Sequence, residues 1–436
     1  MNKLVLLVEN IDGKTLTTPI DILTKGYRET GRYVEQWCLQ EKHEMANLVK
    51  NHIEFQNINQ IENFDPNTKY AYYVPLNLFF EMPPLNLFQI MSQSTYEKIV
   101  NNNITLLISF QLDMFDPTVT NHFINKFYDW SRYHMWCGLH TNKTIFLTGC
   151  KLDNSFNQFL HNSMPNYRFL YSPLLLFWSK FGLQNNNISC FEILNNYLAK
   201  GDKKLYTHLN KSGRIHRYTL LHGLRANNLL ADSITSNVHD AELDINQFRE
   251  IIDQKHYDNV NKNLIFSYQD ILLQDMSRGS IGQILLDVDS SSPHRYVNWN
   301  YKPSWFTDSC FDIVGETGSY YDKTQWLQFT ILSEKIAKTM YNFKPFIING
   351  GHGSLEILKD FGFETWPEVF DESYDKETNM IERQRIIVEN VQKWQHRKEE
   401  FMDIIRQNKN KLQHNHNHLL NFDAEKKLYD TLIPHI

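Results

Sequence analysis

Short apolar runs recur along the chain, each bounded by polar residues and separated from the next by a stretch of helical character. A run of this kind is typical of a strand buried inside a parallel sheet. In the first half the runs are Lys3–Val8, Tyr70–Val74, Ile104–Phe110, Thr144–Thr148 and Phe169–Tyr171. Between two of them, Ser94–Val100 offers a serine N-cap with Glu97 three residues later, which predicts a helix start. Strands that alternate with helices imply βαβ units, so this half is expected to be Rossmann-like.

A second strand–helix series follows in the second half of the chain. It predicts a helix over Tyr218–Leu230 and strands at Lys204–His208, Leu264–Ser267, Phe311–Val314 and Phe346–Asn349. The polar, aromatic-rich stretch between Asp289 and Ser304 is expected to be a long irregular connection. The fold class predicted is α/β, with two Rossmann-like domains facing a cleft, at residues 1–185 and 186–375.

The last segment, residues 376–436, is expected to be a helical extension. Glu377–Asn410 is charged, and the spacing of its apolar residues predicts one long amphipathic helix or a bent pair. The remainder, Lys411–Ile436, is polar as far as Leu428. It contains three alternating histidines, His414, His416 and His418. On a strand these could meet at a metal, but we expect a solvated tail because a metal site also needs outer partners.

Composition restricts the function classes. The formal net charge of −6 argues against a protein that coats nucleic acid, although a local basic groove would be compatible with it. The five cysteines show no CxxC spacing, which indicates a reducing compartment and neither a zinc knuckle nor a disulfide framework. No apolar run reaches the length of about 18 residues that a membrane-spanning helix needs. We therefore expect a cytoplasmic protein, in the host cytoplasm if the chain is viral.

The stretch from Phe311 to Asp375 carries the most chemistry. Glu316 follows one expected strand, and Gly350, Gly351 and Gly353 follow the next and open a helix. Ligands of doubly wound sheets bind outside the carboxyl ends of the strands, and free N–H groups of a helix start could meet a diphosphate. A carboxylate there suits a sugar diol. The plainer interpretation is that Gly350–Gly353 forms a tight turn and that Glu334 is a solvated residue of the preceding helix.

Ordered short motifs in this region resemble those of one enzyme family. They are Val314-Gly315-Glu316-Thr317, Ser333-Glu334-Lys335, Lys344-Pro345-Phe346-Ile347, Gly362-Phe363-Glu364-Thr365 and Asp371-Glu372-Ser373-Tyr374-Asp375, preceded by Leu209-Asn210 and Arg214-Ile215-His216-Arg217. The set resembles the C-terminal, donor-nucleotide half of α-1,3-fucosyltransferase-like glycosyltransferases, particularly uncharacterised relatives from phages and marine bacteria. The resemblance covers roughly residues 204–375.

This resemblance implies a GT-B glycosyltransferase whose C-terminal domain binds a nucleotide-sugar. In the Ser333-Glu334-Lys335 motif it places Glu334 on a hydroxyl pair and Lys335 near phosphate or in a structural ion pair. Arg214 and Arg217 become candidates for the diphosphate, with His216 assisting, because a guanidinium grips two oxygens at once. The two arginines could equally form a surface pair. Gly315 and Gly318 depart from the family pattern and leave the position of Glu316 open.

An inverting transferase also needs a group that takes the proton of the acceptor. Asp113 follows the Ile104–Phe110 run and is our candidate, with Asp116 and Glu9 as rivals; each could instead cap a helix. Asp287-Val288-Asp289 could hold Mg²⁺ or Mn²⁺ against a diphosphate. The GT-B interpretation requires no metal, so we expect no cofactor besides the nucleotide-sugar substrate.

The acceptor stays open between a glycan or surface polymer and a hydroxymethylated base of phage DNA. A different class of function is also compatible with the sequence, since a fold does not guarantee an activity. In that case the chain is a catalytically inactive GT-B scaffold that serves as an assembly or interaction protein. The helix expected at Glu377–Asn410 would then be its surface for a partner or for a second copy in an oligomer.

Overall fold

The computed structural model describes residues 3–12, 15–17, 45, 48, 51–75, 91–110, 143–152, 167–172, 190–199, 201–210, 215–237, 304–316, 329–378 and 380–436. The chain divides into two compact units. The first unit comprises Met1–Leu175 together with Asp423–Ile436, and the second comprises Leu176–Phe422. The helical segment after residue 375 is therefore shared between the two units.

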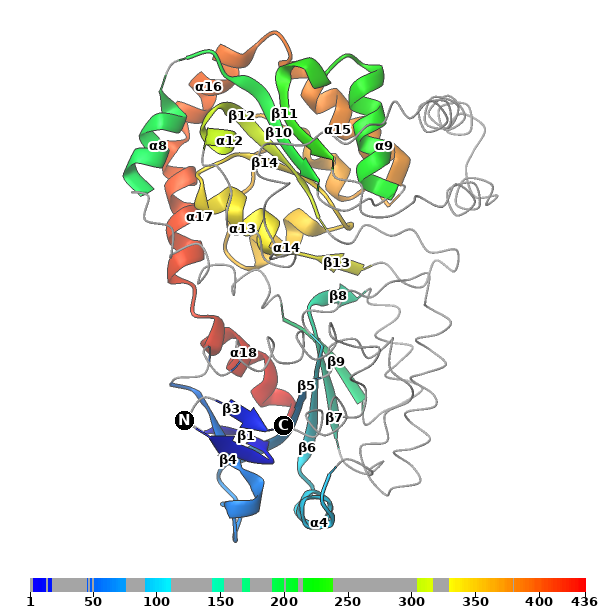
Figure 1. The fold of residues 1–436 in the computed structure, drawn as a ribbon, viewed down its shortest axis with the longest axis vertical. Coiled ribbons are helices and arrows are strands. Elements are labelled where there is room, and N and C mark those ends of the chain that lie inside the picture. Colours follow the sequence, from blue (N-terminus) through cyan, green and yellow to red (C-terminus); the bar gives the residue numbers. More distant parts are fainter. Residues whose placement is uncertain are drawn as a thin grey trace, which may run out of the picture. The chain divides into compact units, whose positions relative to one another are not determined.

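The first unit contains a six-stranded parallel sheet in the order β4-β1-β5-β6-β7-β9 (Figure 1). Its strands are β1 (Leu4–Val8), β4 (Ile53–Asn57), β5 (Lys69–Pro75), β6 (Thr105–Phe110), β7 (Thr144–Thr148) and β9 (Tyr167–Tyr171). All five strands expected in this half are confirmed. β1 and β7 are buried along their whole length, as interior strands of a covered parallel sheet must be. The edge strand β4 was not expected, because its Glu and Gln side chains interrupt the apolar pattern.

Smaller elements complete the first unit. β2 (Asn10–Asp12) and β3 (Thr15–Thr17) pair antiparallel, and β8 (Cys150–Leu152) follows β7. Helix α4 (Gln93–Asn101) begins earlier than expected. Its N-cap is Ser92, whose hydroxyl oxygen accepts a hydrogen bond from the backbone N–H of Thr95 at 3.0 Å. The predicted cap at Ser94 was wrong, since Ser94 lies inside the first turn.

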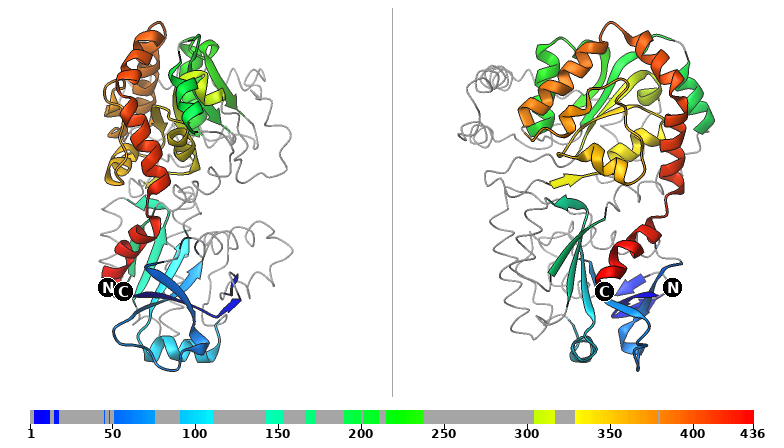
Figure 2. Two further views of the ribbon diagram at one scale, coloured as in Figure 1. Left: turned by 90° about the vertical axis from the view of Figure 1, so that its left-hand side faces the viewer. Right: turned by 180° about the vertical axis from the view of Figure 1, so that it is seen from behind.

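The C-terminal segment returns to the first unit as helix α18 (Ala424–Leu432), which lies beside β1 and β4 in Figure 2. The carboxylate of Glu425 accepts hydrogen bonds of 2.8–3.0 Å from the backbone N–H groups of Asn51, His52 and Ile53. Lys69 Nζ donates to the backbone oxygen of Ile436 at 3.0 Å. These bonds fix the end of the chain to the start of β4 and β5.

The second unit contains a four-stranded parallel sheet in the order β11-β10-β12-β14. Its strands are β10 (Lys204–Asn210), β11 (Ser233–Asn237), β12 (Ser309–Gly315) and β14 (Phe346–Asn349), with the short strand β13 (Phe329–Ile331). Its first helices are α8 (Cys190–Leu198), α9 (Ile215–Ala226), α12 (Ser304–Thr307), α13 (Glu334–Tyr341) and α14 (Ser354–Asp360). The structure is thus mixed α/β with two parallel, Rossmann-like sheets.

Three of the strands expected in this half are confirmed as β10, β12 and β14. The helix expected at Tyr218–Leu230 begins at Ile215 and ends at Ala226, and β11 was not expected. The strand expected at Leu264–Ser267 and the connection at Asp289–Ser304 lie outside the described residues except for Ser304.

Three further helices belong to the second unit: α15 (Met380–Trp394), α16 (Lys398–Gln407) and α17 (Lys409–Asn421). The first two are the bent pair that the sequence allowed, and α15 lies side by side with α9 (Figure 1). Within the described part of the chain, the structure contains no helix with the length and apolar character to span a membrane.

The prediction of a solvated tail after Lys411 was wrong. His416 on α17 is buried; its Nδ1–H donates to the carbonyl of Tyr341 at 2.7 Å, and its ring stacks on Phe343 with centroids 4.0 Å apart. His414 and His418 donate to the carbonyl oxygens at the end of α14, those of Gly362 and Phe361. The three imidazoles therefore satisfy carbonyl groups that helix ends leave without intrahelical partners. Within the ranges described, no group of three or more His, Cys, Asp or Glu side chains is placed to hold a metal ion.

Candidate functional site

The strand order of the second unit reverses between β10 and β12. From β10 the chain proceeds to β11 on one side and later to β12 on the other, and ligands of open α/β sheets bind at the carboxyl ends of the strands beside such a reversal. His216 and Arg217 stand there in the first turn of α9, and Glu316 directly follows β12. The sequence-predicted donor residues therefore converge at the reversal point.

Glu316 connects the surrounding segments. Its backbone carbonyl accepts hydrogen bonds from His216 Nε2 and Arg217 Nη2, both at 2.9 Å. Its backbone N–H donates to the carbonyl of Asn349 at 3.1 Å. Its carboxylate accepts from Ser333, from the backbone N–H at 3.0 Å and from the hydroxyl at 2.5 Å. Glu316 is fully buried, so it holds the ends of β12, β14, α9 and α13 together rather than facing a ligand.

Glu334 and Lys335 form the accessible part of the site. Ser333 caps α13, and Lys335 Nζ contacts both the Ser333 hydroxyl and the Glu334 carboxylate at 3.1 Å. The Glu334 and Lys335 side chains are 25% and 27% exposed. Burial raises the pKa of Glu334, but the charges of Lys335 and Lys338 outweigh it and hold that pKa at about 2. An ionised carboxylate and the amine of Lys335 thus lie partly exposed beside Ser333, whose hydroxyl also binds the buried Glu316.

A buried polar network supports the site from β10, and the sequence analysis did not find it. His208 Nδ1–H donates to the carbonyl of Ile313 at 2.8 Å, and Asn210 Nδ2 donates to His208 Nε2 at 2.8 Å. Burial and, less strongly, the charge of Arg217 lower the pKa of His208 to about 4, against the hydrogen bond to Ile313, which raises it. His208 is therefore neutral at pH 7.

Because Gly315 has no side chain, it provides the space that this network occupies. A Cβ atom at residue 315 would lie 2.6 Å from Asn210 Oδ1 and 3.4 Å from Arg217 Nε. Glycine at position 315 thus has a packing reason, because the missing side chain leaves room for Asn210. Gly318 lies outside the described residues.

Two side-chain amides, those of Asn349 and Gln384, hold the start of α9. Asn349 Nδ2 and Gln384 Nε2 both donate to the carbonyl of His216, at 3.1 Å and 2.7 Å. Gln384 lies on α15, about 170 residues away in sequence, which is why no local motif could have revealed this contact.

Three N–H groups at the start of α14, those of Gly353, Leu355 and Glu356, are engaged within the protein. Gly353, with φ of 75°, donates from its N–H to the carbonyl of Asp375 at 2.9 Å. The N–H groups of Leu355 and Glu356 donate to the Asp375 carboxylate at 3.0 Å and 3.3 Å. The expectation that these groups are free for a diphosphate was wrong, because Asp375 caps α14. The backbone carbonyl of Gly351 accepts a hydrogen bond from the Ser354 hydroxyl at 2.7 Å.

In the first unit, the carboxylate of Glu9 has a position comparable to that of Glu316 in the second unit. Its strand order reverses between β1 and β5, and Glu9 directly follows β1. Tyr72 on β5 donates its hydroxyl to Glu9 Oε1 at 2.7 Å, and Thr95 on α4 donates to Oε2 at 3.0 Å. Burial and the charge of Glu9 both raise the pKa of Tyr72, which therefore stays a donor. Two neighbouring elements thus fix the Glu9 carboxylate at this reversal point.

Several candidates named from the sequence lie outside the described residues. They are Arg214 of the donor set, Asp113 and Asp116 of the proton acceptors, and Asp287 and Asp289 of the metal motif. Comparisons of the chain with protein-family models, curated proteins and solved structures find no match.

Proposed function

We propose that the protein is a glycosyltransferase that moves a sugar from a nucleotide-sugar to a hydroxyl acceptor, in a GT-B arrangement without a required metal. The supporting observation is the convergence of Arg217, Glu316 and the Ser333–Lys335 segment at the reversal point of one parallel sheet. These residues come from two distant parts of the sequence, and only the fold joins them.

The roles follow from charge and exposure. Lys335 is the cation that meets the diphosphate, and the ionised Glu334 accepts hydroxyl groups of the ribose or sugar. Charge gathers on the diphosphate as the glycosyl bond breaks, so a cation there stabilises the transition state more than the ground state. Arg217 and His216 are positioning residues, since both bind the backbone of Glu316. Arg214 stays a candidate for the diphosphate.

The acceptor's proton requires a base, and two candidates stay in this proposal. Glu9 has a defined setting at the reversal point of the first unit, held by Tyr72 and Thr95. Asp113 stays the candidate that the sequence favoured. The acceptor is a glycan, a surface polymer or a hydroxymethylated base of phage DNA.

One observation favours the alternative, an inactive scaffold that acts as an assembly or interaction protein. Asp375 occupies two N–H groups at the start of α14, so fewer backbone donors face an anion than the sequence predicted. The two functions differ in a simple property, because only the enzyme needs to bind a nucleotide-sugar.

Isothermal titration of the full chain with a panel of nucleoside diphosphates and nucleotide-sugars tests the proposal. We expect at least one of them to bind, and Lys335→Ala to weaken that affinity about tenfold by removing the phosphate's cation. Lys359→Ala is the matched control, since Lys359 on α14 pairs with Glu372 away from the site. A chain that binds none of the panel would leave the scaffold function.

A further inference from the structure

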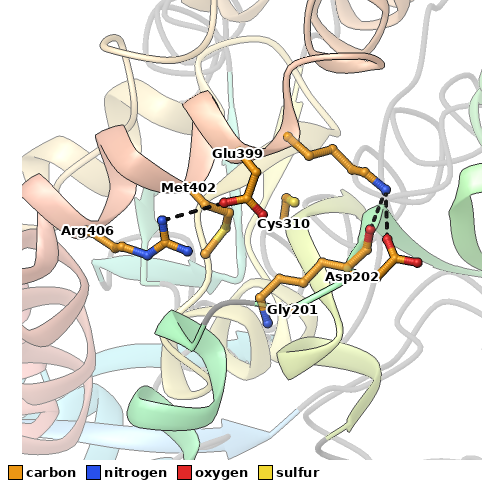
Figure 3. Close-up of a pocket in the computed structure, with 8 residues that line it drawn as sticks. Gly201, Asp202, Cys310, Glu399, Met402 and Arg406 are labelled. Atoms are coloured by element: carbon orange, nitrogen blue, oxygen red, sulfur yellow. Dashed lines mark hydrogen bonds and ion pairs between the residues drawn. The ribbon is translucent and has the colours of Figure 1, made fainter.

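A cavity of about 360 Å³ lies in the second unit near the starts of β10 and β12, at the opposite end of the sheet from the proposed donor site. Cys310 lies on β12, and Met402 and Arg406 come from α16 (Figure 3). Lys203 directly precedes β10, and Lys398 is the first residue of α16. The volume falls within the range of pockets that bind small molecules. None of these residues takes part in the site described above.

The cations of this cavity are more deeply placed than its acids. Lys203 is 9% exposed, and the Lys398 and Arg406 side chains are 27% and 22% exposed. The two acids that line the cavity, Asp202 and Glu399, have side chains that are 100% and 68% exposed. Solvent screens the acids far more than the cations, so the interior has a positive potential.

The hydrogen bonds of Lys203 and Arg406 leave donors for a ligand. Lys203 Nζ donates to the carbonyl of Thr307 at 2.5 Å, and its contact with the carbonyl of Asn196 is 3.5 Å long. Arg406 donates from Nε to the carbonyl of Leu198 and from Nη1 to Asp403. Among the residues that the structure describes, Nη2 of Arg406 has no acceptor. A neutral carbonyl group orients each of these cations. Arg406 is also paired at 2.5 Å with the Asp403 carboxylate, whose side chain is 62% exposed.

The charges of the lining residues that are not paired within the protein indicate which ligand charge the cavity favours. Lys398 pairs with Asp232 at 3.1 Å and donates to the carbonyl of Lys203 at 2.6 Å. Lys203 then supplies a positive charge toward the cavity, Arg406, paired with the exposed Asp403, supplies the N–H donors of Nη2, and Met402 supplies an apolar wall. Burial raises the pKa of the Cys310 thiol to about 11 despite the opposing charges of Lys344, Lys398 and Lys203. The thiol of Cys310 is therefore uncharged at pH 7.

We propose that this cavity binds a phosphate monoester of a small organic molecule, with its phosphate on Lys203 and Arg406 and its organic part against Met402. A planar guanidinium binds two phosphate oxygens at once, and a lysine beside it binds a third as a point charge. The N–H donors of Lys203 and Arg406 suit phosphate oxygens, and the apolar wall favours an ester over inorganic phosphate.

Isothermal titration of the full chain with glycerol 3-phosphate tests this site, with inorganic phosphate and glycerol as comparison probes. We expect glycerol 3-phosphate to bind more tightly than either. Arg406→Gln should weaken it about tenfold. Glu399→Gln should tighten it several-fold, because Glu399 lies 3.9 Å from Arg406 and competes for its charge. Arg385→Gln is the control, since Arg385 on α15 pairs with Glu382 and Glu389.

The Glu399 variant gives a readout that loss of structure would not imitate, because misfolding cannot increase affinity. No binding of glycerol 3-phosphate, or equal binding by the Arg406→Gln and wild-type chains, would overturn the proposal. Binding that is lost in Lys335→Ala and kept in Arg406→Gln would place the probe at the donor site and overturn it as well. These outcomes are independent of whether a nucleotide-sugar binds elsewhere.

Discussion

Arg217 Nη2 donates to the backbone carbonyl of Glu316 at 2.9 Å, and this bond joins the first turn of α9 to the residue that follows β12. Both residues are buried, so the guanidinium is a fixed part of the sheet's carboxyl end. Arg217 was predicted to bind a diphosphate, but it orients Glu316, whose carboxylate binds Ser333. Ser333 in turn contacts Lys335.

Replacing Arg217 with alanine should therefore reduce stability as well as nucleotide affinity. The change removes a buried donor from the Glu316 carbonyl, and we expect the free energy of unfolding to fall by about 2 kcal/mol. Urea denaturation measures this loss. Arg225→Ala, at the exposed end of the same helix, is the control and should have a smaller effect. An Arg217→Ala chain of unchanged stability would mean that the guanidinium has no positioning role.

Gly315→Ala should destabilise the second unit because its Cβ would meet Asn210 Oδ1 at 2.6 Å. We expect a loss of about 1–3 kcal/mol, the usual cost of overpacking. Gly201→Ala is the matched control, because a Cβ there meets nothing within 4 Å. The double variant Gly315→Ala with Asn210→Ala should recover part of the loss. A thermal melt of the four chains checks this, and equal losses at both glycines would contradict it.

The neutral, buried His208 predicts a pH dependence of stability. Its pKa is about 4 in the folded chain and near 6.5 when unfolded, so the unfolded state binds more protons between these values. The free energy of unfolding should therefore fall as the pH drops from 6.5 to 4, by up to about 3 kcal/mol from this residue. Denaturation curves at pH 7 and pH 5 measure the slope. His208→Gln should flatten it, and an identical slope in both chains would exclude His208 as its source.

Glu425→Ala should destabilise the first unit although the residue lies near the C-terminus. Its carboxylate accepts hydrogen bonds from the backbone N–H groups of Asn51, His52 and Ile53. The alanine variant leaves these three donors without this acceptor. We expect a loss of about 2 kcal/mol. Hydrogen exchange at residues 51–53 should rise at the same time. Glu400→Ala, which removes an exposed pair with Arg397, serves as the control. Unchanged exchange at β4 would show that α18 does not stabilise this edge.

Most strands of the two sheets could be predicted because burial on both faces leaves a local apolar signal. Leu4–Val8 and Thr144–Thr148 are buried throughout and carry that signal fully. The two strands that were missed, Ile53–Asn57 and Ser233–Asn237, lie at sheet edges and keep polar residues, so their apolar pattern was too weak. The capping signal at Ser94 failed for another reason, because Ser92 offers the same chemistry two residues earlier.

The candidate site was predictable only in part. Glu316 directly follows a recognisable strand, which placed it at the carboxyl end of the sheet. Glu334 and Lys335 were candidates through the resemblance of their motif, and Ser333 marks the helix start before them. The partners that hold them could not be predicted, since Gln384 and Asp375 act from distant parts of the chain. The buried role of His416 was hidden in the same way, because polar residues that satisfy helix ends resemble solvated ones in sequence.

A crystal structure of the full chain with a bound nucleoside diphosphate tests the proposed function most directly. The proposal predicts density for the phosphates beside Lys335 and for the ribose within reach of Glu334, at the carboxyl ends of β10 and β12. Phosphates beside Lys203 and Arg406 instead, or an empty donor site at saturating nucleotide, would contradict it.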